Sequence, residues 1–584
     1  MPRTRLNSAQ RARSLASMGS EPVDLLVVGG GVTGAGIALD AATRGLRTAL
    51  VEAQDWAGGT SQWSSKLVHG GLRYLYQLNF ALVAEALRER GLLLTRTAPH
   101  LVKAQPFLWP LKTPVVERSY SAVGVGMYDM LAQFGGGGHS AVPSQRHYSK
   151  DGARELFPSL REDALIGAIR FYDARVDDAR LVIDLVRTAL GYGALCASRA
   201  RVVDYLREEG TETVVGALVH DLEAGAQVSV RARHVVTATG VWTGRTQDLA
   251  TDEGGLKVLA SKGIHIVVPT EAIRGETGVF LRTEKSVLFI IPWDRYWVVG
   301  TTDTPWHEDL THPVPTSADI DYVLEHANSV LADPLSRSDI IGTYAGLRPL
   351  LQPKATGGNS AKVSREHTVA EVVPGLSAIA GGKLTTYRVM AEDAVDFALT
   401  QSWGKEELKK RPSITETIPL VGAAGYAAWQ AQRDRIAADE GWSIERVQHL
   451  LDRYGDELPV ILDLVADDAD LGRPLAQAEA YLRVEVLFAV THEGALHLED
   501  VLRKRIRLDH EQRDRGLAAA EEIAAIMAPL LAWSQEQQQA EIEHYTARVA
   551  ALVEAETRSS DDEAVKPLLA VGDVPGRHDA GGPT

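Results

Sequence analysis

Three glycines and one carboxylate near the start of the chain have the spacing of a dinucleotide-binding site. Gly29, Gly31 and Gly34 fit the pattern G-x-G-x-x-G, and Glu52 follows at about the 20-residue distance that the pattern requires. The first glycine permits a tight turn, the second admits a pyrophosphate to the backbone, and the third lets a helix pack closely on a strand. The helix N-terminus offers N–H groups to phosphates, and a carboxylate at position 52 can accept ribose hydroxyls. We therefore expect this segment to bind a dinucleotide.

A second group of reactive side chains lies just after Glu52. Residues 59–75 gather hydroxyls, a lysine, a histidine and an arginine among close glycines. A solvated loop that enters a helix is one interpretation. The other is a ligand-lining loop, because loops at the carboxyl ends of parallel strands line the crevice in nucleotide-binding folds. The candidate cofactor contacts in this loop are Thr60, Ser61, Ser65, Lys66, His69 and Gly70.

The elements around the glycine pattern explain how it would be positioned. Residues 23–28 form a short apolar run typical of a buried parallel strand, and residues 35–44 read as a helix with Gly45 at its C′ position. Residues 46–51 give a second strand that ends at Glu52. Residues 234–240 predict another buried strand. The order of strand, glycine turn, helix and strand predicts a Rossmann-like unit.

The middle of the chain favours antiparallel structure. Residues 199–236 alternate like a meander, and residues 287–293 and 296–300 read as a strand pair across a short turn. Thr316 and Asp319 have capping-box spacing at the start of a helix predicted to end near residue 332. The fold class predicted is therefore α/β with an α+β part, in which an antiparallel sheet carries the substrate.

The cofactor domain is predicted over residues 22–403. The substrate domain is interleaved with it, at roughly residues 95–170 and 255–345. A connector at 404–420, rich in Lys, Pro and Thr, leads to a helical domain at 421–556.

Both ends of the chain are predicted to lack regular structure. Residues 1–21 carry several arginines without an apolar run and read as a flexible lead-in. Residues 557–584 contain Asp, Gly and Pro without periodicity and read as a disordered tail.

Composition excludes several classes of function. The chain has 584 residues, 77 acidic against 61 basic residues and a net charge of −16, which argues against broad nucleic-acid binding. A single cysteine, Cys196, cannot form an intrachain disulfide and is expected to be a core thiol. The sequence has no stretch near the roughly 18 apolar residues that a membrane-spanning helix needs. It contains neither a Cys/His metal cluster nor a G-x-S-x-G nucleophile elbow.

Ordered motifs along the chain resemble those of FAD-dependent glycerol-3-phosphate dehydrogenases. The resemblance covers roughly residues 22–400 strongly and 415–530 more weakly, and the related oxidases share the motifs. Gln62 and Trp63 stand where this family usually has small residues. The motifs are G-G-G-V-T-G-A-G at 29–36, S-S-K-L-V-H-G-G-L-R-Y-L at 64–75, V-D-D-A-R-L at 176–181, I-P-W at 291–293 with G-T-T-D at 300–303, Y-A-G-L-R-P-L at 344–350 and G-G-K-L-T-T-Y-R at 381–388.

The resemblance implies non-covalent FAD and oxidation of sn-glycerol 3-phosphate to dihydroxyacetone phosphate, with electrons passed to a quinone. An oxidase that uses oxygen and releases hydrogen peroxide is the alternative, and a flavin-binding redox module without turnover is a third. The strand that ends at Gly240 resembles one that returns to the cofactor in flavoproteins of the two-dinucleotide type. The further cofactor contacts implied are Gly240, Gly382, Leu384 and Thr385.

The resemblance also implies the reacting groups. A dianionic phosphate needs cations, and arginine offers them as a fixed fork. The substrate-binding candidates are Arg73, Tyr74, Arg348 and Lys383. A histidine suits proton abstraction near neutral pH, and His265 is favoured over its rival His69. Arg348 is also expected to polarise the substrate oxygen.

The densest basic cluster lies at residues 503–507, in the sequence V-L-R-K-R-I-R-L. One interpretation is a solvated helix face whose apolar residues turn inward. The other is contact with an anionic membrane, since the resemblance implies a cytoplasmic protein at the periphery of the inner membrane. A homodimer is a further expectation.

Overall fold

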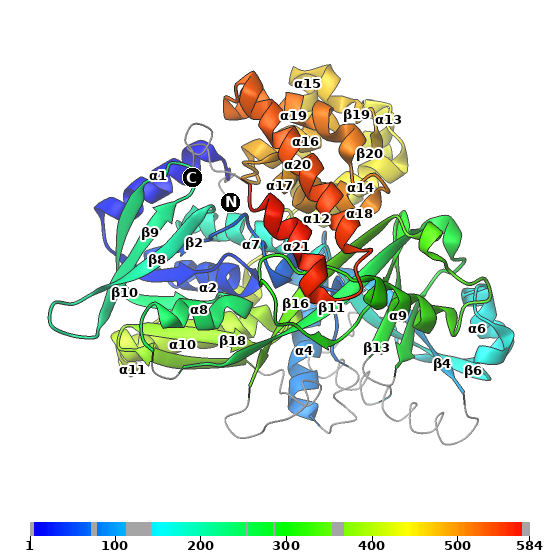
Figure 1. Ribbon diagram of the computed structural model, residues 1–584, viewed down its shortest axis with the longest axis horizontal. Helices are drawn as coiled ribbons and strands as arrows, with labels where there is room; N and C mark the ends of the chain where they lie inside the picture. Colours follow the sequence, from blue (N-terminus) through cyan, green and yellow to red (C-terminus); the bar gives the residue numbers. More distant parts are fainter. Residues whose placement is uncertain are drawn as a thin grey trace.

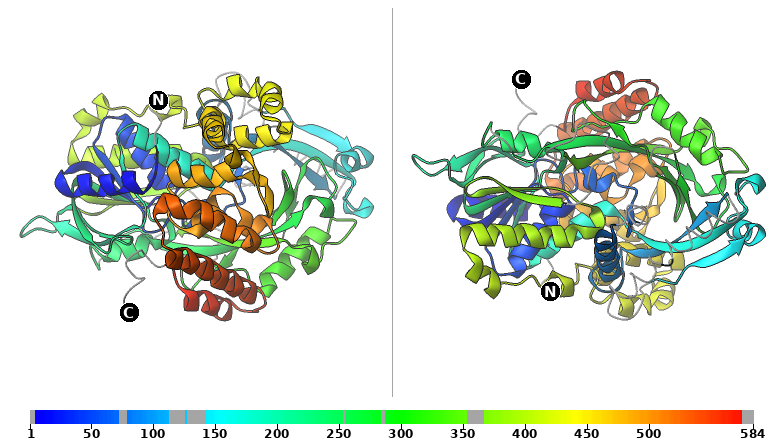
Figure 2. Two further views of the ribbon diagram at one scale, coloured as in Figure 1. Left: turned by 90° about the horizontal axis from the view of Figure 1, so that it is seen from above. Right: turned by 90° about the horizontal axis from the view of Figure 1, so that it is seen from below.

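The computed structural model describes residues 5–71, 79–112, 126, 142–252, 255–283, 287–352 and 367–574. These residues form three parts (Figure 1). A domain built on a parallel sheet and a domain built on a largely antiparallel sheet lie side by side, and a helical domain lies over the boundary between them, as the view from above shows (Figure 2).

The parallel sheet has the strand order β17-β18-β10-β1-β2-β7, in which the edge strand β17 runs antiparallel to β18. Strand β1 is central and runs parallel to both neighbours, so that Val28 pairs with Val51 on one side and with Thr237 on the other. The carboxyl ends of these strands therefore meet at one edge of the sheet. The strands are β1 (Val23–Val28), β2 (Thr48–Val51), β7 (Leu195–Ala197), β10 (Gln227–Thr237), β17 (His367–Val373) and β18 (Leu376–Gly381), with β8 (Ala200–Arg207) and β9 (Val214–Asp221) attached at β10.

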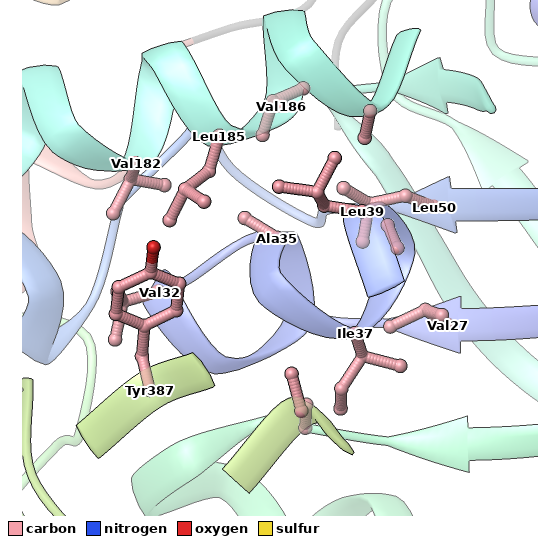
Figure 3. Close-up of a cluster of buried hydrophobic side chains, with 14 of the residues drawn as sticks. Val27, Val32, Ala35, Ile37, Leu39, Leu50, Val182, Leu185, Val186 and Tyr387 are labelled. Carbon is pink, nitrogen blue, oxygen red and sulfur yellow. The ribbon is translucent and has the colours of Figure 1, made fainter. Parts of the chain in front are cut away.

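Three helices cover one face of this sheet. Helix α2 (Val32–Thr43) lies between α7 (Asp178–Gly191) and α10 (Tyr387–Ser402), and its apolar side chains interdigitate with both (Figure 3). Its positions are buried almost all round, because strands lie on one side and helices on the others. Gly45 has a φ of 79° and ends the helix, as the sequence predicts. The expected order of strand, glycine turn, helix and strand is confirmed.

Residues 8–20 correct the prediction of a flexible lead-in. They form helix α1 (Ser8–Ser20), which is capped by the side chain of Asn7 and packs on the opposite side of the sheet. Arg11 is buried and pairs with Asp221, and Gln10 donates a hydrogen bond to the carbonyl of Cys196. The buried partner of Arg11 lies far along the chain, so the local sequence gave no sign of it.

The antiparallel sheet has the strand order β15-β11-β14-β13-β12-β4-β6-β3, with β16 paired to β11 and β5 to β6. The predicted strand pair is confirmed, since Trp293 pairs with Tyr296 across the turn. The strands are β3 (Leu67–Val68), β4 (Lys103–Leu111), β5 (Arg146–Ser149), β6 (Gly167–Arg175), β11 (Val258–Pro269), β12 (Gly278–Arg282), β13 (Val287–Trp293), β14 (Tyr296–Gly300), β15 (Thr304–Pro305) and β16 (Gly342–Leu351).

Helices border this sheet and its connections. Helix α9 (Ser317–Asn328) begins at a capping box in which Thr316 and Asp319 satisfy each other's backbone, as predicted. The other helices of these two domains are α4 (Phe80–Leu92), α6 (Lys150–Leu156), α8 (Thr243–Asp248) and α11 (Lys405–Lys410).

The C-terminal domain is mainly helical, with one departure from the prediction. Within the domain predicted to be helical, the chain forms the two short strands β19 (Pro474–Leu475) and β20 (Ala478–Leu482) before α16 begins at Arg483. The helices are α12 (Tyr426–Gln430), α13 (Arg433–Glu440), α14 (Ile444–Tyr454), α15 (Leu458–Asp467), α16 (Arg483–Thr491), α17 (Leu498–Asp500), α18 (Leu508–Glu511), α19 (Leu517–Leu531) and α20 (Gln535–Ala555).

Part of the expected disordered tail is also ordered. Residues 561–571 form helix α21 (Asp561–Val571), which packs on α20 and crosses in front of β11 and β16 (Figure 1). Leu568 is buried in a cluster with Trp306 and Leu347. Asp561 pairs with the ammonium of Lys262, which lies in the antiparallel sheet. Burial of a few apolar side chains and one charge pair thus fixes a segment whose composition alone suggests disorder.

The basic cluster at 503–507 lies in the seam between the helical domain and the cofactor domain. Arg505 is fully buried and forms a two-pronged ion pair with Asp55, and Lys504 lies 3.1 Å from the same carboxylate. Arg507 is also buried and lies 2.6 Å from Asp178. The solvated-face interpretation is therefore wrong, and these side chains do not face a membrane. No helix among the residues that the structure describes is both long and apolar enough to cross one.

Candidate functional site

A cavity of about 740 Å³ opens at the carboxyl edge of the parallel sheet and extends to the antiparallel sheet. This volume lies within the range of small-molecule and cofactor sites, about 300–1,000 Å³. Gly31 and Glu52 lie at one end of its lining, and His265, Arg348 and Lys383 come from the second sheet and from the loop after β18. The two sheets therefore contribute to one continuous site.

Two positions of the glycine turn, Gly29 and Gly34, have no room for a Cβ atom. Gly29 has a φ of +109°, and a Cβ there would lie 2.6 Å from the carbonyl oxygen of Ala238. A Cβ on Gly34 would lie 1.8 Å from the carbonyl oxygen of Gly29, so the third glycine permits the close packing of helix on strand that the pattern predicts. The hydroxyl of Ser61 accepts the N–H of Val32 and completes the first turn of α2.

Glu52 lies at the end of β2 with its carboxylate fixed by backbone donors. The N–H groups of Gly30 and Gln54 donate to it at 2.5 and 2.7 Å. Burial raises the pKa of this carboxyl, and the two N–H donors oppose that effect. Glu52 thus combines a fixed position on the cavity wall with acceptor capacity for hydroxyl groups.

The residues of this end fit a dinucleotide. Gly31 and Gly240 both border the cavity, and a Cβ on Gly240 would meet nothing within 4 Å. Both glycines leave room in the wall where a ligand must approach the backbone. The helix N-terminus, the bordering glycines and the acceptor carboxylate together form the cradle that an adenine dinucleotide requires.

The loop after β2 divides into residues that line the cavity and residues that support it. Thr60 donates to the carbonyl of Leu347, and the N–H of His69 donates to the hydroxyl of Thr385, which ties this loop to both other segments of the wall. Gly70 does not line the cavity itself, but its N–H donates to Asp173, which does. The predicted cofactor contacts that line the cavity are Gly29, Gly31, Glu52, Thr60, Ser61, Ser65, His69, Gly240, Gly382, Leu384 and Thr385.

Lys66 is placed differently from the prediction. Its side chain is 2% exposed and turns away from the cavity, so that the ammonium lies 2.9 Å from Asp178. It also donates to the carbonyl of Gln62. Lys66 therefore supports the loop from behind rather than contacting a ligand.

His265 lies on β11 at the opposite end of the cavity. Its Nε2 atom is 2.9 Å from the hydroxyl of Ser65, and its ring stacks on Tyr344 with centroids 4.7 Å apart. Burial keeps the pKa of His265 well below its usual range, and the nearby cations of Arg348 and Lys66 lower it further. The imidazole is therefore neutral near pH 7 and able to accept a proton. The rival base, His69, also borders the cavity.

Two of the predicted cations line the cavity. Arg348 on β16 is held by the hydroxyl of Thr301 at 3.1 Å and by Asp303 at 3.5 Å. Lys383, directly after β18, also lines the wall. Two of the three predicted phosphate-binding cations, Arg348 and Lys383, therefore line the cavity. The third, Arg73, lies outside the described residues together with Tyr74.

The structure adds wall residues that the sequence did not indicate. Trp242, Arg245 and Thr246 line the cavity from the start of α8. Their position directly after the strand ending at Gly240 could have identified them. Trp63, which replaces a small residue of the family pattern, also borders the cavity and packs against Gly346, where a Cβ would lie 2.6 Å from the Trp63 Cβ.

Comparisons with known proteins agree with this geometry. A family model described as FAD dependent oxidoreductase matches residues 24–388, and one described as the C-terminal domain of alpha-glycerophosphate oxidase matches residues 413–538. The fold and the cavity thus define an FAD-dependent oxidoreductase, and the predicted fold class and cofactor are confirmed.

Individual relatives narrow the class. A glycerol-3-phosphate dehydrogenase from Mycobacterium leprae (strain TN) is 50% identical over 96% of this chain and 94% of its own length. A mitochondrial glycerol-3-phosphate dehydrogenase from Rattus norvegicus is 35% identical over 93% of this chain and 75% of its own. The solved glycerol-3-phosphate dehydrogenase from Bacillus halodurans, complexed with FAD, has a TM-score of 0.74 at 26% identity, over 93% of this chain and 97% of that one. The chain belongs to the glycerol-3-phosphate dehydrogenase family.

Proposed function

We propose that the chain oxidises sn-glycerol 3-phosphate to dihydroxyacetone phosphate and passes the electrons to a quinone. The observation that carries the proposal is that His265, Arg348 and Lys383 line the same cavity as the glycine turn and Glu52. The names of the most similar relatives support the same substrate. When bound, FAD supplies the hydride acceptor, and the protein's part is to bind, orient and tune.

The protein's residues divide the remaining work. Arg348 and Lys383 neutralise the phosphate, the first as a planar fork and the second as a point charge. Asp303 and Thr301 hold the guanidinium of Arg348 in place, so little of its freedom is lost when substrate binds. His265 accepts the proton of the C2 hydroxyl. The Ser65 hydroxyl can donate to Nε2 when that atom is unprotonated and accept from it when it carries a proton.

The substrate is tested by anaerobic bleaching of the bound flavin. We expect sn-glycerol 3-phosphate to bleach the yellow colour, and glycerol and sn-glycerol 1-phosphate to leave it. Bleaching by an unphosphorylated polyol at similar concentration would exclude a phosphate-selective site.

Arg348→Ala tests the phosphate contact. Loss of a charged hydrogen-bonding partner from a binding site costs about 2–5 kcal/mol, so kcat/KM should fall at least about thirtyfold while FAD stays bound. Arg274→Ala is the matched control, because Arg274 is an exposed arginine with a loose partner. Near-normal kinetics in Arg348→Ala would remove this residue from the site.

The electron acceptor is tested by stopped-flow reoxidation. The reduced flavoprotein should react rapidly with a soluble quinone analogue and slowly with oxygen. Rapid reaction with oxygen and release of peroxide would favour the oxidase instead, and the family model that matches the helical domain carries an oxidase's name. A quinone acceptor further suggests a cytoplasmic protein at the membrane surface, although Lys504, Arg505 and Arg507 are buried and do not supply that contact.

A further inference from the structure

Two sequence motifs that the proposed reaction leaves unused meet directly behind the wall of the cavity. Asp178 belongs to V-D-D-A-R-L and begins helix α7, and Arg507 belongs to the basic cluster of the helical domain. Both side chains are buried, Asp178 completely. Burial of a charge is costly unless it is paired and hydrogen-bonded, so the arrangement around Asp178 needs an explanation.

Asp178 binds the loop that carries Ser65. Its Oδ2 atom accepts both the N–H of Ser64, at 3.1 Å, and the hydroxyl of Ser64, at 2.7 Å. Its Oδ1 atom accepts from the ammonium of Lys66 at 2.9 Å and from the guanidinium of Arg507 at 2.6 Å. The carboxylate thus fixes both residues that flank Ser65.

The other side of the same loop contacts His265 and Tyr344, at the part of the cavity that we call the reaction end. The hydroxyl of Ser65 lies 2.9 Å from Nε2 of His265. The hydroxyl of Tyr344 donates to the carbonyl of Ser64 at 3.1 Å, and the Tyr344 ring stacks on His265. A shift of residues 64–66 would therefore move the hydrogen-bonding partner of the imidazole.

We propose that Asp178 is a positioning residue that holds Ser65, and through it His265, by clamping Ser64 and Lys66. The proposal rests on the proposed function, in which His265 accepts the substrate proton. Arg507 completes the clamp from the helical domain, so docking of that domain supports the geometry of the reaction end. Asp178, Lys66 and Arg507 do not line the cavity, so they act on it through the loop that carries Ser65.

The clamp also balances charge around His265. Besides burial, the groups that act on the His265 imidazole are the cations of Arg348 on β16 and Lys66 on the loop, which lower its pKa, and Asp178 on α7, which raises it. Removal of the Asp178 charge should therefore move the acid limb of the kcat/KM profile to lower pH, a change that simple loss of packing does not produce.

Asp178→Asn is the primary test, with Asp184→Asn as its matched control. Asp184 is a buried carboxylate on the same helix that pairs with His100, away from the cavity. In Asp178→Asn, kcat should fall about 100-fold with KM changed less than about threefold, and the acid limb should move down. Asp178→Glu restores the negative charge and should return the acid limb of the kcat/KM profile toward its wild-type pH. Equal falls in kcat for both Asn variants at matched flavin content, or an unmoved limb, would overturn the proposal.

Ser64→Ala keeps the charge pairs and removes one hydroxyl, so it tests the clamp if Asp178→Asn does not fold. We expect kcat to fall about tenfold, since one hydrogen bond to a charged group is lost; an unchanged kcat would count against the clamp.

A second readout does not depend on turnover. Carbethoxylation of His265 by diethyl pyrocarbonate, followed by mass spectrometry on substrate-free protein, should titrate at lower pH in Asp178→Asn than in the wild type. If this shift occurs while sn-glycerol 3-phosphate fails to bleach the wild type, the proposed function fails and the clamp stands. If bleaching occurs and no shift is seen, the clamp fails alone.

Discussion

The opening β-α-β unit and the seam under the helical domain are held together by opposite means. The unit packs apolar side chains and bare backbone, with Gly34 directly against Gly29. The seam buries charges whose partners lie hundreds of residues apart. Its pairs are Asp55 with Arg505, Arg180 with Glu493, Arg187 with Glu457, Arg199 with Asp500, and His497 with Glu223.

This difference predicts different sensitivities. Apolar packing responds to added or lost volume and is nearly indifferent to pH. A buried ion pair is weak evidence of net stability, but loss of one partner leaves an uncompensated charge in a poorly solvated place. We therefore expect that removal of a single charge destabilises the seam, and that addition of a single methyl group destabilises the β-α-β unit.

Arg505→Met should have the largest effect. It leaves Asp55 with the ammonium of Lys504 and the more distant cation of Arg199, and the free energy of unfolding should fall by about 3–5 kcal/mol in thermal or urea unfolding. Arg161→Met is the control, because Arg161 forms an exposed pair with Asp163 and its loss should leave the unfolding free energy nearly unchanged. Equal effects of the two changes would contradict the role given to the seam.

His497 gives the seam a pH dependence. Burial and Arg199 lower its pKa, but the carboxylates of Glu541 and Glu223 outweigh them and raise it to about 9. The stabilisation is then fully present below about pH 6.5 and is lost as pH rises through 9. It amounts to roughly 3 kcal/mol on this shift.

The pH dependence is measured by urea unfolding between pH 6 and 10. In His497→Gln the fall in stability over this range should be smaller than in the wild type. Parallel curves for the two proteins would show that His497 is not the titrating group.

Gly34→Ala tests the β-α-β unit. The added Cβ would lie 1.8 Å from the carbonyl oxygen of Gly29, so helix and strand must separate, at a cost of about 1–3 kcal/mol and with loss of bound FAD. Gly91→Ala is the control: Gly91 lies in helix α4, and a Cβ there meets nothing within 4 Å. That change should leave flavin content unaltered, and a flavin-replete Gly34→Ala protein would disprove the packing argument.

Glu52→Ala should have the smallest effect. It removes the acceptor from the cofactor end without adding volume, so FAD should bind about tenfold more weakly, or 1.4 kcal/mol, with thermal stability of the apoprotein little changed. Flavin retention after dilution measures this. Full occupancy would count against a ribose contact at Glu52.

The sequence-based predictions were accurate for the locally determined β-α-β unit and less accurate for segments that depend on long-range contacts, such as the seam. The β-α-β unit and the strand pair around Asp294 were predictable because hydrophobic periodicity and glycine spacing are local signals. The loop at 59–71 was also predictable as a cavity wall, since it follows the carboxyl end of β2. The direction of Lys66 within it was not, because Asp178 lies on a distant helix.

The errors fall where long-range contacts outweigh composition. The residues of helix α1 were predicted to be a flexible lead-in, but the ion pair between Arg11 and Asp221 fixes them. The residues of α21 were predicted to be disordered, but Leu568 is buried with Trp306. The basic cluster at 503–507 was expected to lie on the surface, but Lys504, Arg505 and Arg507 are buried. A charged residue is expected to be exposed to solvent unless it is paired with an opposite charge. When that partner lies far along the chain, the local sequence does not reveal it.

By itself, the sequence determined the dinucleotide cradle, the family motifs and the chemical types of the reacting groups. The tertiary structure alone decided that His265 and Arg348 face one cavity, that Lys66 and Arg507 share Asp178 behind its wall, and that the helical domain is fastened by buried charge. The reason is physical. Turn geometry and burial periodicity act over a few residues, whereas a buried charge is stable only where folding brings its counterion within a few ångströms.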